Sequence, residues 1–104
     1  MPYDPEIADR VRAIIGGATV DVEEKRMMGS LCFMVNGKMA VGVSSSEVFF
    51  PMGGGEALAT ALQRGAHRLT MKGGRTAPFA ALDDPDDDSL ADWIGEAVER
   101  ALNA

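Results

Sequence analysis

The single cysteine and the single histidine are the two side chains whose chemistry could make this chain an enzyme. Cys32 and His67 would act as nucleophile and base only if the fold brought them within hydrogen-bond distance. Cys32 lies in the hydrophobic run 31–35, where a thiol usually behaves as a small buried hydrophobe, and no third residue is evident that would orient His67. We therefore assign no catalytic residue, expect a protein that is not an enzyme, and place His67 on a surface loop or at the end of a strand.

Two further patterns have residue types that bind ions. Acidic residues cluster between positions 83 and 88, but the run lacks the central glycine and distal glutamate of a calcium loop. Its expected role is to start the last helix, where negative charge opposes the positive end of the helix dipole. Glycines 53–55 precede a predicted helix, as in a phosphate-binding loop, but no Gly-Lys-Ser/Thr follows, and Glu56 places negative charge where phosphate would bind. One cysteine allows no disulfide and no Cys-x-x-Cys zinc pair. The sequence therefore predicts no metal site and no cofactor site.

Charge is distributed unevenly along the 104 residues, whose formal net charge is −6. Residues 1–24 hold two basic and six acidic side chains, residues 25–82 hold seven basic and two acidic, and residues 83–104 hold one basic and eight acidic. The net acidity argues against general affinity for nucleic acid, whereas the basic middle section would bind it if its side chains converge. The candidate basic patch consists of Lys25, Arg26, Arg64, Arg68, Lys72 and Arg75.

Length and composition are those of one soluble globular domain spanning residues 1–104. Hydrophobic residues make up 46 % of the chain and charged residues 25 %. The N-terminus lacks the basic and apolar run of a signal peptide, and the longest apolar stretch, 31–35, is too short to cross a bilayer. We therefore expect a cytoplasmic protein with no membrane contact.

Hydrophobic periodicity predicts helices near both ends of the chain and one in the middle. Asp4 and Pro5 begin the first helix, and the glycines at 16–17 end it. A short helix is predicted over 56–64, and the last one from Asp87 or Asp88 to Leu102.

Strands are predicted between these helices. Residues 19–52 have the pattern of an antiparallel sheet, in which Asn36-Gly37 is the strongest hairpin signal because both central residues of a type I′ turn need positive φ. A final pair of short strands is predicted over 67–72 and 78–82. The fold class is therefore two-layer α+β, an antiparallel meander of about four to six strands flanked by N-terminal, middle and C-terminal helices.

The hairpin predicts which side chains share a face. A regular two-residue turn places Met34 opposite Met39 and Cys32 opposite Val41 on one face, while Phe33 lies on the other. Both faces are then apolar, although an antiparallel sheet with one solvated face should alternate more cleanly. One face is expected to carry the helices, and the other to be covered by another segment or by a second copy of the protein. The candidate interface consists of Met34, Met39 and Val41.

Residues 25–39 resemble the signature of the TfoX N-terminal domain family, also called Sxy, a family of competence regulators. In that pattern a basic residue precedes Met-Phe-Gly-Gly, an aromatic strand, Asn-Gly and a second strand; here Met28 replaces the phenylalanine and Ser30 the second glycine. Segments 71–75 and 90–94 are also similar, whereas 76–79 departs from the basic, glycine-containing pattern. The motif residues are Met28, Gly29, Phe33, Asn36, Gly37 and Trp93.

The resemblance implies an antiparallel α+β fold similar to that of secretion chaperones. It also implies a role like that of transcriptional co-regulators of competence genes, and it brings no catalytic residues. Named members carry a further C-terminal helical domain, so this chain is expected to be a stand-alone version of the N-terminal domain.

Three functions follow as hypotheses. The first is a non-enzymatic regulatory or interaction module, a homodimer through the hairpin region. The second is contact with nucleic acid through the basic section 25–75. The third is small-molecule binding in a groove beside Met28, Phe33 and Trp93.

Overall fold

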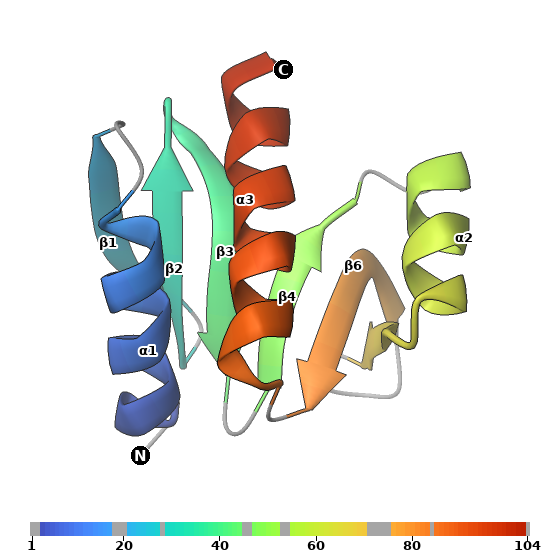
Figure 1. Ribbon diagram of the computed structural model, residues 1–104, viewed down its shortest axis with the longest axis horizontal. Helices are drawn as coiled ribbons and strands as arrows, with labels where there is room; N and C mark the ends of the chain where they lie inside the picture. The colour runs from blue at the N-terminus through green and yellow to red at the C-terminus, as the bar shows by residue number, and fades with distance from the viewer. Residues whose placement is uncertain are drawn as a thin grey trace.

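The computed structural model describes residues 3–17, 21–27, 29–44, 47–52, 55–70, 76–83 and 85–103. These residues form three helices and six strands (Figure 1). In chain order they are α1 (Pro5–Ile15), β1 (Val22–Met27), β2 (Ser30–Val35), β3 (Lys38–Ser44), β4 (Glu47–Pro51), α2 (Gly55–Gln63), β5 (His67–Thr70), β6 (Thr76–Asp83) and α3 (Asp87–Asn103).

The strands form one antiparallel sheet in the order β1-β2-β3-β4-β6-β5. The first four strands are a meander, in which each strand pairs with its neighbour in sequence. β6 then pairs with β4 on one side and with β5 on the other, so β5 becomes the second edge strand. The predicted α+β fold with an antiparallel sheet is confirmed.

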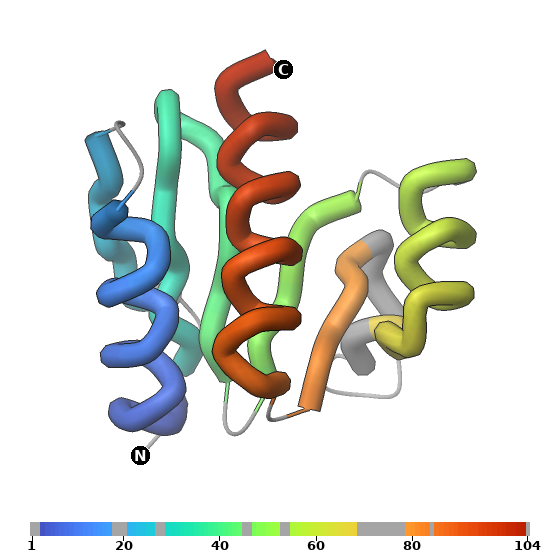
Figure 2. The backbone as a smooth tube through the Cα atoms, viewed as in Figure 1, coloured from blue at the N-terminus to red at the C-terminus, as the bar shows by residue number. Residues whose placement is uncertain are grey.

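The helices pack against one face of the sheet. α1 and α3 lie side by side over this face, and α2 lies beside β6 and β5 (Figure 1). The same arrangement is visible in the backbone trace, where α3 runs along the middle of the sheet (Figure 2). All three helices contribute buried side chains to one main core with the sheet. At its centre Trp93 of α3 stacks on Phe50 of β4, with ring centroids 5.5 Å apart.

Acidic residues cap the first and last helices, as the sequence predicts. The Asp4 carboxylate accepts a hydrogen bond of 2.9 Å from the backbone amide of Glu6 at the start of α1. The Asp86 carboxylate accepts one of 2.8 Å from the amide of Ser89 in the first turn of α3. Asp86 therefore has the helix-starting role expected for the acidic run 83–88.

The Asn36-Gly37 turn is confirmed, but the predicted register holds only next to it. Both residues have positive φ, 55° and 76°, and Met34 pairs with Met39 as expected. β3 then contains one extra residue, Ala40, so that Phe33 pairs with Val41 and Cys32 with Gly42. A bulge of this kind reverses which face each following residue occupies.

The bulge makes the assignment of Val41 to the candidate interface wrong. Val41 shares the helix-covered face with Phe33, and both are 0 % exposed in the main core. Met34 and Met39 do lie on the opposite face, as predicted. There they pack with Phe79 against a second cluster, which consists of Cys32, Phe49 and Ala81.

Glycine at position 42 makes room for an aromatic ring on that second face. Phe49 lies directly across the strand pair from Gly42, and its ring stacks on Phe79 at 5.7 Å between centroids. A Cβ atom at position 42 would lie 2.2 Å from Cζ of Phe49. The ring could accept an alanine only by leaving its place beside Phe79.

We therefore expect Gly42→Ala to lower the free energy of unfolding by about 1–3 kcal/mol, the usual cost of overpacking. The matched control is Gly95→Ala, because a Cβ there meets no atom within 4 Å. Alanine in the interior of α3 should instead stabilise the protein by about 0.5–1 kcal/mol. Urea denaturation measures both. Equal stability of Gly42→Ala and the wild type would contradict the close packing.

Candidate functional site

The face of the sheet opposite the helices is the largely apolar surface that the fold leaves for function. We call it the open face, and its apolar side chains are Cys32, Met34, Met39, Phe49, Phe79 and Ala81. In the described part of the chain, no helix contributes a side chain to this cluster. Met34, Met39 and Phe79 are half-buried, so they present apolar surface to solvent. Beside Met39 and Phe79 an apolar groove of about 540 Å³ continues past Pro51 to the end of α3.

The open face has a different polar group at each edge. Strand pairing places one row of residues across the whole sheet, namely Lys25, Cys32, Gly42, Phe49, Ala81 and His67. Directly paired residues share a face, so a lysine ends the row at β1 and a histidine ends it at β5. Next to that histidine lie two carboxylates. The open face is therefore apolar in the middle and acidic at the β5 edge, whereas the β1 edge carries Lys25 together with Glu23, whose carboxylate oxygen lies 3.8 Å from the lysine Nζ.

The structure does not bring the described members of the candidate basic patch together. Lys25 and Arg26 lie on β1, and Arg68 lies on β5, the opposite edge strand. Five strand spacings of ~4.8 Å separate these edges by about 24 Å. Arg26 also projects to the other face from Lys25, where its guanidinium lies 5.9 Å from the centroid of the Tyr3 ring. Lys72 and Arg75 lie outside the described residues.

Arg64, the remaining member, belongs to a groove between α2 and α3. Its guanidinium lies 4.2 Å from the centroid of the Trp93 ring and donates a 2.9 Å hydrogen bond to Glu96. The groove has a volume of about 360 Å³, and Arg100 also lines it. The sequence did not single out Arg100, yet its Nη2 is buried with no hydrogen-bond partner among the described residues, and burial lowers the pKa of this guanidinium.

This groove only partly matches the groove predicted beside Met28, Phe33 and Trp93. Trp93 lines it, as expected. Phe33 lies within the main core and is 0 % exposed, so it cannot touch a ligand there. Met28 lies outside the described residues.

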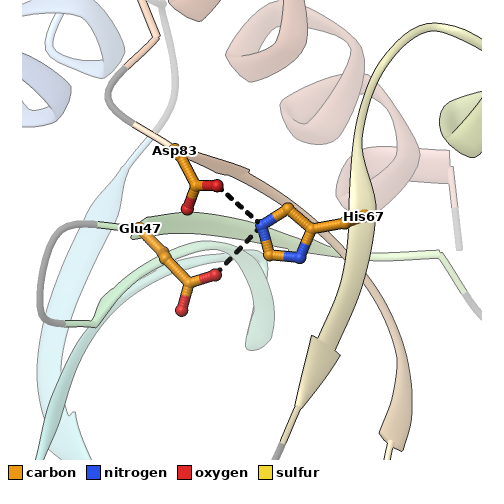
Figure 3. A group of neighbouring side chains, drawn as sticks. All are labelled: Glu47, His67 and Asp83. Carbon is orange, nitrogen blue, oxygen red and sulfur yellow. Dashed lines mark ion pairs between the residues drawn. The ribbon is translucent and has the colours of Figure 1, made fainter.

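Glu47, His67 and Asp83 form the second polar site, at the acidic edge of the open face (Figure 3). Glu47 begins β4 and pairs directly with Asp83 at the end of β6. His67 begins β5, at the end of a strand as predicted, and pairs with Ala81. Its Nε2 lies 3.1 Å from Oε2 of Glu47 and 3.3 Å from Oδ2 of Asp83. Three strands that are separate in sequence thus bring three ionisable groups together.

The hydrogen bond at the other ring nitrogen orients the imidazole. Nδ1 of His67 lies 3.1 Å from the backbone carbonyl oxygen of Arg68. The hydrogen bond to this carbonyl and the two carboxylates together raise the pKa of His67 above 6.5, although partial burial opposes the shift. Cys32 is not part of this site: it lies four strands away, about 19 Å at the usual strand spacing. Burial also raises the pKa of its thiol, so Cys32 lacks the features of a reactive nucleophile.

Glu47, His67 and Asp83 are also the one group of potential metal ligands within the described ranges. Their ligand atoms all lie within 4.8 Å of one another. The sequence prediction of no metal site considered ligand clusters that are close in sequence. Such a test could not find three residues that only the order of the strands brings together.

Protonation of His67 should stabilise the fold, and the sign follows from its raised pKa. The stabilising free energy from protonated His67 is fully present below pH 6.5, the pKa of histidine in the unfolded chain. It is lost as the pH rises through the higher pKa of His67 in the folded protein. We expect the wild type to be more stable than His67→Gln near pH 6 and to lose this advantage as the pH rises through the raised pKa of His67. Because His67 is 45 % exposed, the difference should stay below about 1 kcal/mol.

Urea titrations of both proteins across this range, with a chelator present, measure the effect. Glu56→Gln is the control for pH-dependent changes unrelated to His67. A stability difference that grows with pH would contradict the ion-pair geometry.

The fold and the open face define a class of protein: a small α+β module whose sheet has helices on one face and an apolar, solvent-contacting surface on the other. The family model described as TfoX N-terminal domain matches residues 17–101. The chain therefore belongs to the TfoX N-terminal domain family, which is a family of regulatory, non-catalytic domains. No curated protein and no solved structure matches the chain. No helix among the described residues is long and apolar enough to span a membrane.

The described motif residues of the family lie at positions that determine the fold. Gly29 has φ of 82°, and Asn36 and Gly37 form the positive-φ turn between β2 and β3. Phe33 and Trp93 are buried in the main core. The motif thus specifies the hairpin and its packing against α3. The open face is where this chain has surface available for a partner.

Proposed function

We propose that this protein is a regulatory interaction module, similar in role to competence regulators, that acts as a homodimer through the open face. The observation that carries the proposal is the half-buried apolar set Met34, Met39 and Phe79, which packs on the buried cluster of the open face and to which no described helix contributes. A sheet face of this composition is costly to expose to water and gains free energy when a partner covers it. Membership in a family of regulatory domains supports an interaction role.

One symmetric arrangement of two copies brings Lys25, which also pairs with Glu23 of its own chain, opposite the acidic edge. Consider two open faces stacked with a two-fold axis parallel to the strands. This operation places β1 of one copy opposite β5 of the other, so Lys25 faces the edge that carries Glu47 and Asp83. The contact occurs twice because the interface is symmetric. One surface therefore supplies an apolar centre and a charged rim, the arrangement of a standard interface.

Contact with nucleic acid has less support. The described cations of the candidate basic patch are divided between the two edge strands of the sheet and, for Arg64, the groove between α2 and α3, and the chain carries a formal net charge of −6. Affinity for phosphate backbones needs several cations on one surface. This function would gain support only if DNA bound with a strong dependence on salt.

We expect the wild type to be a dimer and the double variant Met34→Glu/Met39→Glu to be a monomer. Two carboxylates in the apolar contact would have to be desolvated, which should weaken the dimer at least about 100-fold. Sedimentation velocity over a concentration series measures the dissociation constant. The control is Leu102→Glu, because Leu102 is 47 % exposed and lies on α3, away from the open face.

Circular dichroism must show that the variants are folded. A wild type that is monomeric at millimolar concentration would overturn the homodimer. A dimer that dissociates in Leu102→Glu but persists in the double variant would assign the contact to another surface.

The groove between α2 and α3 supports a second candidate, the binding of a small organic anion. Its specific feature is Arg100, whose Nη2 is buried without a hydrogen-bond partner among the described residues; an anion would reach this donor only if the guanidinium turned toward the groove, and it would have to overcome the charge of Glu56 and Glu96 in the lining. Trp93 would provide an apolar wall for the body of the ligand.

We expect citrate or inorganic phosphate to raise the melting temperature of the wild type, because a ligand that binds only the folded state stabilises it. The effect should disappear in Arg100→Met, which keeps much of the side chain's apolar length. Arg12→Met, an exposed arginine on α1, is the control for nonspecific anion effects. Equal shifts in all three proteins would exclude the groove as the binding site.

A further inference from the structure

The carboxylates of Glu47 and Asp83 need a cation between them. They are direct cross-strand partners, and like charges in such a pair destabilise a sheet. Lys25, the lysine of this sheet row, is at the far edge, and Arg68 is the residue after His67 on β5, so it projects to the other face. Among the residues that the structure describes, the ring of His67 is the group that faces both carboxylates (Figure 3).

The hydrogen bond of His67 to the backbone determines whether Nε2 directs a proton or a lone pair at the carboxylates of Glu47 and Asp83. A carbonyl oxygen only accepts hydrogen bonds, so Nδ1, 3.1 Å from the oxygen of Arg68, is the nitrogen that carries the proton. In a neutral ring, Nε2 then directs a lone pair at two anionic oxygens, which is repulsive. Only a cation at Nε2 makes the arrangement favourable, and that cation is either a second proton or a metal ion.

The distances from Nε2 of His67 to the two carboxylate oxygens fit a metal ion, and the three ligand atoms all lie within 4.8 Å of one another. Ligands bound at ~2.0–2.1 Å to a tetrahedral zinc ion are about 3.4 Å apart. The distances from Nε2 to the two carboxylate oxygens are 3.1 and 3.3 Å. The hydrogen bond from Nδ1 to a carbonyl is also the usual way in which a metal-binding histidine is oriented.

We propose that Glu47, His67 and Asp83 bind one divalent transition-metal ion, with Zn²⁺ as the best-fitting probe. The imidazole selects zinc and its neighbours over Mg²⁺ and Ca²⁺, which prefer sites made only of oxygen. Two carboxylates neutralise the charge of the ion. The side chains of His67 and Asp83 are 45 % and 71 % exposed, so water has access to the fourth position. The bound ion would join the edge strand β5 to β6 and β4.

Binding of the ion does not require the proposed homodimer, because each chain supplies all three ligands, but a bound ion would neutralise the carboxylates that face Lys25 in the proposed pairing. The variant Met34→Glu/Met39→Glu should therefore bind Zn²⁺ like the wild type. A monomeric protein could still bind the metal ion, and a dimer could form without one.

Isothermal titration of the chelator-treated protein with ZnCl₂ at pH 7.5 tests the site. We expect one ion per chain, and an affinity that falls more than about 100-fold in His67→Gln, since even losing a partner outside the coordination shell costs 10–100-fold. Glu47→Gln and Asp83→Asn should each weaken binding. Glu56→Gln, an exposed acid on α2, and Cys32→Ser, which removes the thiol, should bind as the wild type does.

Nitrogen NMR of the His67 ring tests the geometry without any substitution. Zn²⁺ should shift the resonance of Nε2 while Nδ1 stays protonated. Melting curves in EDTA show whether His67→Gln folds. The proposal is overturned if Zn²⁺ does not bind at millimolar concentration, if His67→Gln binds with unchanged affinity, or if the metal shifts Nδ1 alone.

Discussion

Burial of one sheet face beneath the helices is the interaction on which the rest of this structure depends. α3 presents a continuous stripe of buried side chains, from Leu90 to Ala101, and Trp93 within it stacks on Phe50 of β4. α1 packs beside α3 against the same face. With the helices all joined to one core, the described residues leave the other face of the sheet with a cluster made only of strand side chains. The helix-covered face gives the domain its stability, and the open face gives it a surface for contact.

A single extra residue determines the composition of that surface. The bulge at Ala40 turns Val41 toward the helices and places Gly42 on the open face, where the ring of Phe49 lies over it. With a regular hairpin, Val41 would occupy this space and Phe49 could not lie flat against the sheet. The bulge thus removes one apolar residue from the proposed interface and allows a larger aromatic one to cover the same area.

The two edges of the sheet have different chemistry because of where β6 is inserted. Its pairing with β4 places Asp83 directly opposite Glu47, and its pairing with β5 brings His67 to the same end of the sheet. Two carboxylates would not remain adjacent on exposed strands without a compensating cation. The polar site therefore follows from strand order. It also makes the open face asymmetric, with an ion pair of Lys25 and Glu23 on β1 and an acidic edge on β4, β6 and β5.

The sequence by itself determined the features that depend on neighbouring residues. The cap at Asp4, the helix-starting acid Asp86, the Asn36-Gly37 turn and the α+β class were all predictable, because each depends on contacts within a few residues or on the local period of apolar side chains. The bulge at Ala40, the position of β6 and the meeting of Glu47, His67 and Asp83 were decided only by the tertiary structure. These features arise from pairing between strands that are distant in the chain, and that pairing is selected by how well the whole sheet packs beneath its helices.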